Sequence, residues 1–185
     1  MSDNIELNNS GQVSSWEVYY ERLGFLLRRC HQASISQFME ECAEYDLTPT
    51  QFGVLVSLQL TPDMDQIGVA RAIGLDRSTA GSVVERLVNR GLIERIVNAK
   101  DRRRRSLKLT QKGLGIVQAA EPASYLAQKK LVQGLNKQEV ETLISLLSRL
   151  METTHQQNRV VVQSPVLDSK CPEAEKSVKE PALTD

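Results

Sequence analysis

Aromatic side chains are scarce in this sequence: phenylalanine, tryptophan and tyrosine make up 4% of its 185 residues, although 41% of the residues are hydrophobic. The core must therefore be packed mainly from leucine, valine, isoleucine and alanine, a composition that suits packed helices. The length suits one globular domain of ordinary size and is sufficient to bury a substantial core. We expect a single folded domain with polar segments at both ends.

Membrane-spanning and secretion signals are also missing. No apolar run approaches the roughly 20 residues that cross a bilayer, and the first residues, MSDNIELNNSGQ, lack the basic-then-apolar pattern of a secretory signal. The three cysteines, Cys30, Cys42 and Cys171, are widely spaced and form no CxxC, so neither a disulfide framework nor a zinc site is predicted. We expect a cytoplasmic protein with reduced thiols and no cofactor.

The net charge of the whole sequence is zero, but the charges are unevenly distributed. Residues 1–65 carry three basic and ten acidic side chains, a net charge of −7. Residues 76–112 carry eleven basic and four acidic side chains, a net charge of +7. A basic segment inside a neutral chain is typical of a surface that contacts a phosphate backbone.

The N-terminal half shows helical periodicity. Apolar residues recur at three- and four-residue steps from Trp16 to Cys42, which predicts one long helix with a bend near Gly24. Thr48-Pro49 then supplies an N-cap and a proline at the first helical position, so a second helix is predicted to extend to about Leu60. Its predicted core face consists of Phe52, Leu55, Val56 and Leu58–Leu60.

Two short helices joined by a tight turn follow. Asp65 is placed to cap a helix over Gln66–Ile73, and Asp76, after the turn Gly74-Leu75-Asp76, is placed to cap the next one. The helix that Asp76 caps carries a one-sided apolar stripe and ends near Gly91, a natural residue after a helix C-terminus. The stripe consists of Ala80, Val83, Val84, Leu87 and Val88. This pattern is a helix-turn-helix, although the bare pattern fits two packed helices without DNA about equally well.

After Gly91 the helical period of the apolar residues ends, and the pattern becomes that of two β-strands joined in a hairpin. Leu92–Val97 and Ser106–Leu109 are β-prone, and the segment Asn98–Arg105 between them is polar and rich in arginine. Thr110 is placed to cap a helix to about Gln133, in which Pro122 predicts a kink or break. Asn136 is placed to cap a last helix to about Gln157, whose apolar stripe is wider than one small helix needs.

The exposed face of the second short helix is unusually small and polar. When its stripe faces inward, the opposite face presents Arg77, Ser78, Thr79, Gly81, Ser82, Glu85, Arg86 and Asn89. Small side chains let a backbone lie deep in the major groove, and long basic side chains reach phosphates. For Gly81 the alternative interpretation is close packing against a neighbouring helix.

The hairpin tip holds four consecutive arginines, Arg102–Arg105. Such a run is often only a solvated surface. Here it lies at the end of a ribbon that directly follows the helix just described, where arginine can enter a narrow minor groove. We expect Asp101 to pair with Arg103 across the tip and to orient it.

These segments, taken in order, resemble the MarR family of regulators over about residues 16–158. The resemblance rests on Asp76-Arg77-Ser78-Thr79, Leu87-Val88-Asn89-Arg90-Gly91-Leu92-Ile93-Glu94-Arg95, Asp101-Arg102-Arg103 and Leu107-Lys108-Leu109-Thr110-Gln111-Lys112-Gly113. It implies a mainly α fold with a small β-wing: a winged helix-turn-helix in an intertwined helical homodimer that binds a pseudo-palindromic operator in double-stranded DNA. By this resemblance Arg77, Ser78, Thr79, Ser82 and Arg86 match positions of the DNA-reading helix, and Asp101 and Arg103 match the Asp-x-Arg signature of the wing. Arg102 and Arg104 are further DNA-binding candidates, because Arg102, Arg104 and Arg105 crowd around Arg103 and leave open which arginine inserts.

The resemblance also implies separate functional segments along the chain and a small-molecule effector. The expected parts are an N-terminal arm (1–14), a first dimerisation helix (15–46), the DNA-binding lobe (47–110), C-terminal dimerisation helices (111–158) and a disordered tail (159–185). In similar regulators a small anionic aromatic compound binds between dimerisation helices and lobe and ends repression. The segments Leu26–Gln32 and Phe38–Cys42 look most like members that control breakdown of aromatic acids.

A carboxylate effector needs a partly buried cation and an apolar wall, and the first helix offers both. The candidate pocket residues are Tyr19, Arg22, His31 and Phe38. A hydrogen-bonded structural histidine is an equally good interpretation of His31, and surface or dimer ion pairs are the simpler interpretation of Arg22, Arg28 and Arg29.

Three alternatives differ from a regulator that responds to an aromatic acid. Oxidant sensing through Cys30, beside Arg28 and Arg29, is the alternative input for the same fold. An enzyme is not predicted, because Cys30 and His31 are adjacent on a helix and point about 100° apart, so they cannot form a nucleophile–base pair. A helical interaction protein without DNA binding is the third class, and it predicts no salt-sensitive binding to duplex DNA.

Overall fold

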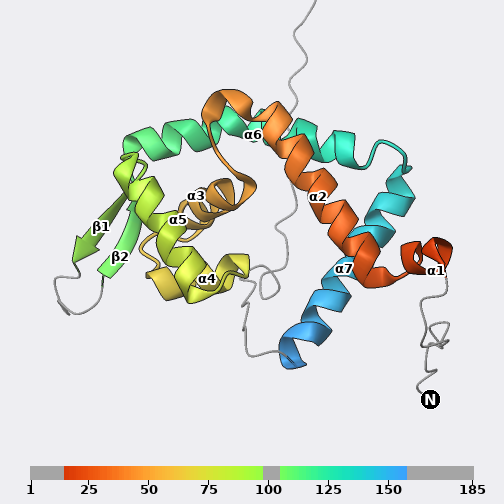
Figure 1. Ribbon diagram of the computed structural model, residues 1–185. Helices are drawn as coiled ribbons and strands as arrows, with labels where there is room; N and C mark the ends of the chain where they lie inside the picture. Colours follow the sequence, from red (N-terminus) through yellow and green to blue (C-terminus); the bar gives the residue numbers. More distant parts are fainter. Residues whose placement is uncertain (1–14, 98–104, 158–185) are drawn as a thin grey trace, which may run out of the picture.

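The computed structural model describes residues 15–97 and 105–157, which form a compact lobe and a helical arm (Figure 1). The lobe contains α3 (Pro49–Leu60), α4 (Gln66–Ile73), α5 (Arg77–Asn89) and a hairpin of β1 (Ile93–Val97) and β2 (Arg105–Leu109). The arm contains α1 (Trp16–Tyr20), α2 (Leu23–Glu41) and α7 (Lys137–Gln157), and a 3-10 turn, Ala43–Tyr45, leads from α2 to α3. Helix α6 (Gln111–Leu131) extends over the lobe and reaches α2. The predicted mainly α fold with a small sheet is confirmed.

The helix starts follow from local capping. The side chain of Thr48 accepts the N–H of Gln51 at 3.2 Å, and Gln51 Oε1 accepts the N–H of Thr48 at 3.0 Å, a reciprocal capping box. Thr110 Oγ1 accepts the N–H of Gly113 at 3.0 Å, and Asn136 Oδ1 accepts the N–H of Glu139 at 3.0 Å. Each cap satisfies N–H groups that have no partner inside the helix, so these starts were readable from the sequence.

The first predicted helix is in fact two helices. The chain leaves helical geometry at Glu21–Arg22, before Gly24, and Arg22 has an extended backbone. This break lets two rings of α1 pack on Phe25: the ring centroids of Tyr19 and Tyr20 lie 4.8 and 5.1 Å from that of Phe25. In one continuous helix Tyr19 and Phe25, six residues apart, would point about 120° apart and could not pack ring against ring. The aromatic packing therefore accounts for the break.

The predicted core face of α3 was partly wrong. Leu55 and Leu58 are buried as expected, but Val54 is fully buried as well and Leu60, at the C-terminal end, is 72% exposed. Helix α3 is apolar on nearly all sides and lies against α4, α5, α6 and β2. Where a helix is covered from several directions, the period of its apolar residues cannot identify one buried face.

Pro122 does not end α6, which continues through it to Leu131. A proline at this position removes one N–H, so the carbonyl of Gln118 loses its partner within the helix. Beyond Pro122, α6 packs along α2, where Lys130 forms ion pairs with Glu41 and, at 3.7 Å, with Glu40. Helix α6 therefore continues past the missing hydrogen bond and contacts α2.

Helix α7 leaves its apolar stripe uncovered. From Lys137 to Thr154 every side chain is exposed except that of Val140. The exposed apolar members are Leu143, Ile144, Leu146, Leu147, Leu150 and Met151. An apolar stripe of this length on a surface is typical of a protein–protein contact.

None of the helices within 15–97 and 105–157 is long and apolar enough to cross a bilayer.

Candidate nucleic-acid interface

Helix α5 is held at its N-terminus by Asp76. The carboxylate accepts the N–H of Thr79 at 2.9 Å and also the hydroxyl of Thr79. Hydrogen bonds from the Thr79 side chain and backbone lower the pKa of Asp76 below its ordinary value. The cap remains charged at neutral pH and fixes the entry of the chain into α5.

This lowered pKa predicts how the stability of the lobe depends on pH. A carboxyl group whose pKa is lowered by folding contributes stability that is complete above its unfolded pKa, about 3.9, and is lost as pH falls through its folded pKa. We expect Asp76→Asn, which retains a capping oxygen without a charge, to unfold more easily than wild type at pH 7. Urea titrations between pH 7 and pH 2.5 should show that difference shrinking only below about pH 4. A difference that persists at the lowest pH would contradict this origin.

The predicted reading face of α5 is exposed on the described surface. Ala80, Val84 and Leu87 are fully buried against the lobe, so the opposite side of the helix faces outward. All five DNA-binding residues predicted on this helix are exposed: Arg77, Ser78, Thr79, Ser82 and Arg86. Ser78, Ser82 and Arg86 are spaced four apart and therefore lie in one row along the helix. The structure places small and basic groups side by side on one exposed face.

Gly81 does not belong to that face. It is half-buried, and a Cβ at this position would lie 3.2 Å from Nε2 of Gln66 on α4. The alternative interpretation, close packing against a neighbouring helix, is therefore the right one. The glycine lets α5 approach α4 closely, which sets how far the helix pair projects its outer face.

The wing, the hairpin of β1 and β2, is rooted in the core. The strands pair antiparallel from Ile93 opposite Leu109 to Val97 opposite Arg105. Leu107 donates its N–H to the carbonyl of Met64 at 2.8 Å, and Ser106 forms a bridge with Asp65, so β2 also pairs with the segment before α4. Arg105 is exposed at the distal end. The predicted tip residues Asp101, Arg102, Arg103 and Arg104, with the expected Asp101–Arg103 pair, lie outside the described residues.

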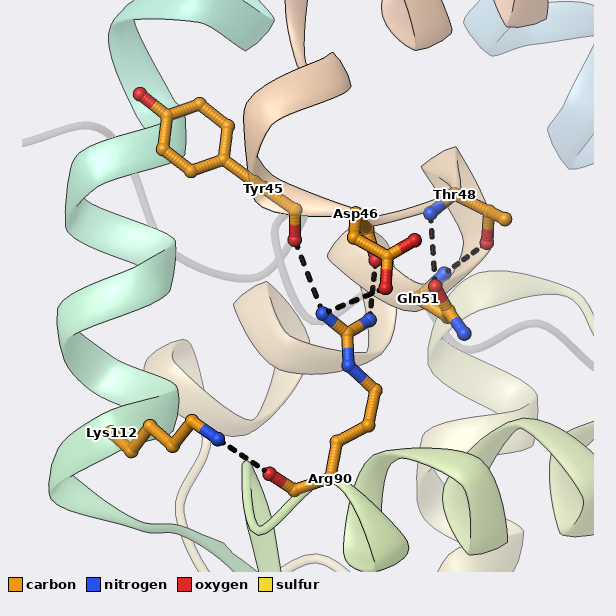
Figure 2. Close-up of polar contacts among 6 residues, drawn as sticks. All are labelled: Tyr45, Asp46, Thr48, Gln51, Arg90 and Lys112. Atoms are coloured by element: carbon orange, nitrogen blue, oxygen red, sulfur yellow. Dashed lines mark hydrogen bonds and ion pairs between the residues drawn. The ribbon is translucent and has the colours of Figure 1, made fainter.

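A set of contacts that the sequence did not reveal ties the end of α5 to the turn between α2 and α3 and to the start of α6 (Figure 2). The guanidinium of Arg90 donates to the carbonyl of Tyr45 at 3.2 Å and to that of Asp46, and lies 3.5 Å from the Asp46 carboxylate. On the other side, Lys112 Nζ donates to the carbonyl of Arg90 at 3.0 Å. These partners are 22 to 45 residues apart in sequence, so no local pattern could pair them. Together they fix the C-terminus of α5 relative to α2 and α6.

The four candidate effector residues are not brought together by a described contact. Phe38 is buried in the core, its ring 5.5 Å from that of Phe52, and Tyr19 belongs to the aromatic cluster with Trp16 and Phe25. Arg22 and His31 are exposed on the arm. The pocket made of these four residues stays a prediction, and Phe38 already has a structural role.

Two hollows lie beside the lobe instead. One, of about 550 Å³, lies between α3 and α6, where the rings of Phe52 and Tyr125 line it and Glu121 is its charged side chain. The other, of about 350 Å³, lies between the end of α2, the start of α3 and α5, and contains Arg86 and Arg90. The first hollow offers apolar walls without a cation, whereas the second offers two cations.

The thiols are in contrasting environments. Cys42 is buried, and burial, together with the charges of Glu41 and Glu44, raises its pKa above the ordinary value. A raised pKa makes the thiol a poorer nucleophile, so Cys42 is unsuited to oxidant sensing. Cys30 is exposed on α2.

A capped helix pair with an exposed small-and-basic face, followed by a hairpin rooted beside it, defines a winged helix-turn-helix protein. The sequence model of the MarR family matches residues 45–104. A probable transcriptional regulator from Pseudomonas aeruginosa is 35% identical, with a TM-score of 0.69 over 71% of this chain and 98% of that one. This chain belongs to the MarR family of DNA-binding transcriptional regulators.

Two further solved structures are similar over a comparable share of the chain. BpsR from Bordetella bronchiseptica, whose DNA binding is regulated by 6-hydroxynicotinic acid, is 29% identical, with a TM-score of 0.69 over 72% of this chain and 95% of its own. The transcriptional repressor CouR, bound to a 23-mer DNA duplex, is 29% identical, with a TM-score of 0.68 over 72% of this chain and 94% of its own.

Proposed function

We propose that this chain is a homodimeric repressor that binds operator DNA with α5 in the major groove and the wing in the adjacent minor groove. The observation that carries the proposal is the exposed row of small and basic side chains on α5, with the other side of the helix buried in the lobe. Serine and threonine side chains are short enough to let the helix backbone approach base edges, and arginine reaches phosphates. The family membership supports the same assignment.

The uncovered apolar surface supports a dimer of the arms. Besides the stripe on α7, α1 and α2 expose Trp16, Tyr20, Leu23, Leu26 and Leu27. A monomer in water would leave this surface hydrated at considerable cost, because apolar burial contributes roughly 25 cal/mol per Å². We propose that a second copy covers these helices and holds two lobes at the spacing of successive major grooves.

DNA binding is tested with Arg86→Ala and Arg103→Ala, one change on α5 and one at the wing tip. A gel shift against the duplex upstream of the gene, at two salt concentrations, should show each variant binding roughly tenfold more weakly, with a salt slope smaller by about one, because each arginine is expected to neutralise a phosphate. Size-exclusion chromatography should show both variants as dimers. Unchanged affinity in both variants would remove the proposed interface.

We further propose that a small aromatic acid ends repression. BpsR responds to such an acid, and the hollows beside the lobe are large enough for one ring. A thermal-shift screen of aromatic acids tests this, because a ligand bound by the native dimer raises its melting temperature by mass action. An acid that raises the melting temperature should also release the duplex. If peroxide releases the duplex and the acids do not, with the peroxide effect absent in Cys30→Ala, the thiol alternative holds instead.

A further inference from the structure

Arg90, at the C-terminal end of α5, contacts two other parts of the chain. Its guanidinium donates to the carbonyl of Tyr45 at 3.2 Å and to that of Asp46, in the turn between α2 and α3 (Figure 2). Its own carbonyl accepts from Lys112 Nζ at 3.0 Å, in the first turn of α6. These three contacts are called the Arg90 clamp below. They link the end of α5 to the two long helices α2 and α6, which pack on each other.

The turn after α2 is shaped to receive this guanidinium. The 3-10 turn Ala43–Tyr45 ends at Asp46, whose backbone is left-handed (φ 50°). Helical hydrogen bonding stops there, so the carbonyls of Tyr45 and Asp46 can accept from outside the turn. Arginine presents its N–H groups as a rigid planar fork, and each terminal nitrogen donates to one of the two carbonyls. Cys42 and Leu47 are buried on either side, so the two acceptors are fixed to the core.

The clamp lies where the side chains of α5 and α2 leave space between them. The hollow of about 350 Å³ is lined by Met39 from α2, by Arg86 and Asn89 from α5, and by Arg90 itself. Helix α5 packs on α3, α4 and β1 instead. A void has no packed atoms on one side to resist movement, so the polar contacts beside it must set the distance between α5 and the end of α2.

The hydrogen bonds, rather than the ion pair, give the clamp its strength. The side chain of Asp46 is 92% exposed and its carboxylate lies 3.5 Å from the guanidinium, so solvent screens the pair and it is weak. The side chain of Arg90 is 29% exposed, and hydrogen bonds from a charged donor to carbonyls are stronger in such a partly shielded place. Asp46→Asn should therefore keep the clamp, because asparagine also adopts the left-handed backbone.

We propose that Arg90 is a positioning residue: it locks the C-terminal end of α5 to the turn between α2 and α3, and thereby fixes the distance between the two copies of α5 in a dimer. The first step concerns a single chain, whereas the second rests on the proposed function. One extra base pair between two half-sites moves them about 3.4 Å apart and rotates one against the other by about 35°. A dimer with fixed helices should reject that change, and a dimer whose helices move against the arms should tolerate it.

The second step is tested with the operator that footprinting locates in the upstream duplex, and with the same duplex carrying one extra base pair between its half-sites. Wild type should bind the longer duplex roughly tenfold more weakly. Arg90→Met, which removes all the N–H donors of the side chain, should bind the native operator more weakly but lose less than about threefold on the insertion. A variant that only lowers the folded fraction weakens binding to both duplexes equally, so it cannot change this ratio. Arg86→Ala, which removes a proposed phosphate contact, and Asp46→Asn should both keep the wild-type ratio.

The first step is tested without DNA, by measuring the distance between two spin labels in one chain. The labels are placed at Gln32→Cys on α2 and Glu85→Cys on α5, both exposed positions. Cys30 and Cys171 are replaced by serine, and the buried third cysteine stays in place. Labelled protein is diluted with an excess of unlabelled protein, so that pairs within one chain dominate the signal. We expect a narrow distribution of distances, and a clearly broader one when Arg90→Met is added.

The two measurements separate the proposal from the proposed function. An equally narrow distribution with and without Arg90→Met would overturn the positioning role. A broader distribution in a protein whose wild type binds no duplex would support the positioning role and remove the proposed function. If wild type binds the operator, an unchanged ratio of the two affinities in Arg90→Met would overturn the claim that the clamp fixes the spacing, and so would equal binding of both duplexes by wild type.

Discussion

Ser82→Glu is expected to weaken operator binding by at least a hundredfold while the protein stays folded. Ser82 lies in the middle of the exposed row on α5, between Ser78 and Arg86. A glutamate there would place a carboxylate, stripped of water, close to the negatively charged phosphates of the groove. Loss of both a close approach and charge complementarity exceeds the effect of removing one phosphate contact, so this change should be more harmful than Arg86→Ala.

The folded state itself should tolerate this glutamate. Serine at an exposed position in a helix is a weaker helix former than glutamate, so the free energy of unfolding of Ser82→Glu should equal or slightly exceed that of wild type. Ser145→Glu is the matched control: it makes the same change of charge at an exposed position on the polar side of α7, away from the lobe. Fluorescence anisotropy with the upstream duplex should show wild-type affinity for Ser145→Glu. Wild-type affinity of Ser82→Glu would mean that this face of α5 does not meet DNA.

The helix-turn-helix was predictable because its signals are local. Asp65 and Asp76 mark helix starts through hydrogen bonds to residues three positions away, and Gly91, with φ 69°, marks the turn after α5. The inward stripe of α5 has the period of a helix buried on one side only. The same logic failed for α3, because a helix covered on several sides carries no preferred face in its sequence.

Specific side-chain contacts could not be predicted from the period of the apolar residues. The break after α1 depends on rings packing on Phe25, and the close approach of α5 to α4 depends on Gln66 opposite Gly81. The two hollows beside the lobe were not predicted for the same reason. The candidate effector residues all come from α1, α2 and the break between them, whereas the hollow of about 350 Å³ is lined by α2, α3 and α5, which meet only after folding.

Gly113→Ala is expected to lower the free energy of unfolding by about 2 to 3 kcal/mol. Gly113 lies in the first turn of α6, where a Cβ would fall 2.0 Å from the carbonyl oxygen of Leu92 and 3.0 Å from its carbonyl carbon. Both are backbone atoms of a fully buried residue, so they cannot move aside as a flexible side chain could. Relief requires α6 to shift away from the root of the wing, which would strain the hydrogen bond of 3.1 Å from the Thr110 N–H to the Leu92 carbonyl.

Gly115→Ala is the matched control, because it lies two residues further along the same helix and a Cβ there has no neighbour within 4 Å. Both substitutions gain the same helix propensity, about 0.5 to 1 kcal/mol, so Gly115→Ala should stabilise the protein by that amount. The difference between the two variants in urea titrations therefore measures the clash alone, about 3 kcal/mol. Because Leu92 immediately precedes β1, Gly113→Ala should also weaken operator binding under conditions where it remains folded. Equal stability of the two variants would mean that α6 and the root of the wing are not in contact at Gly113.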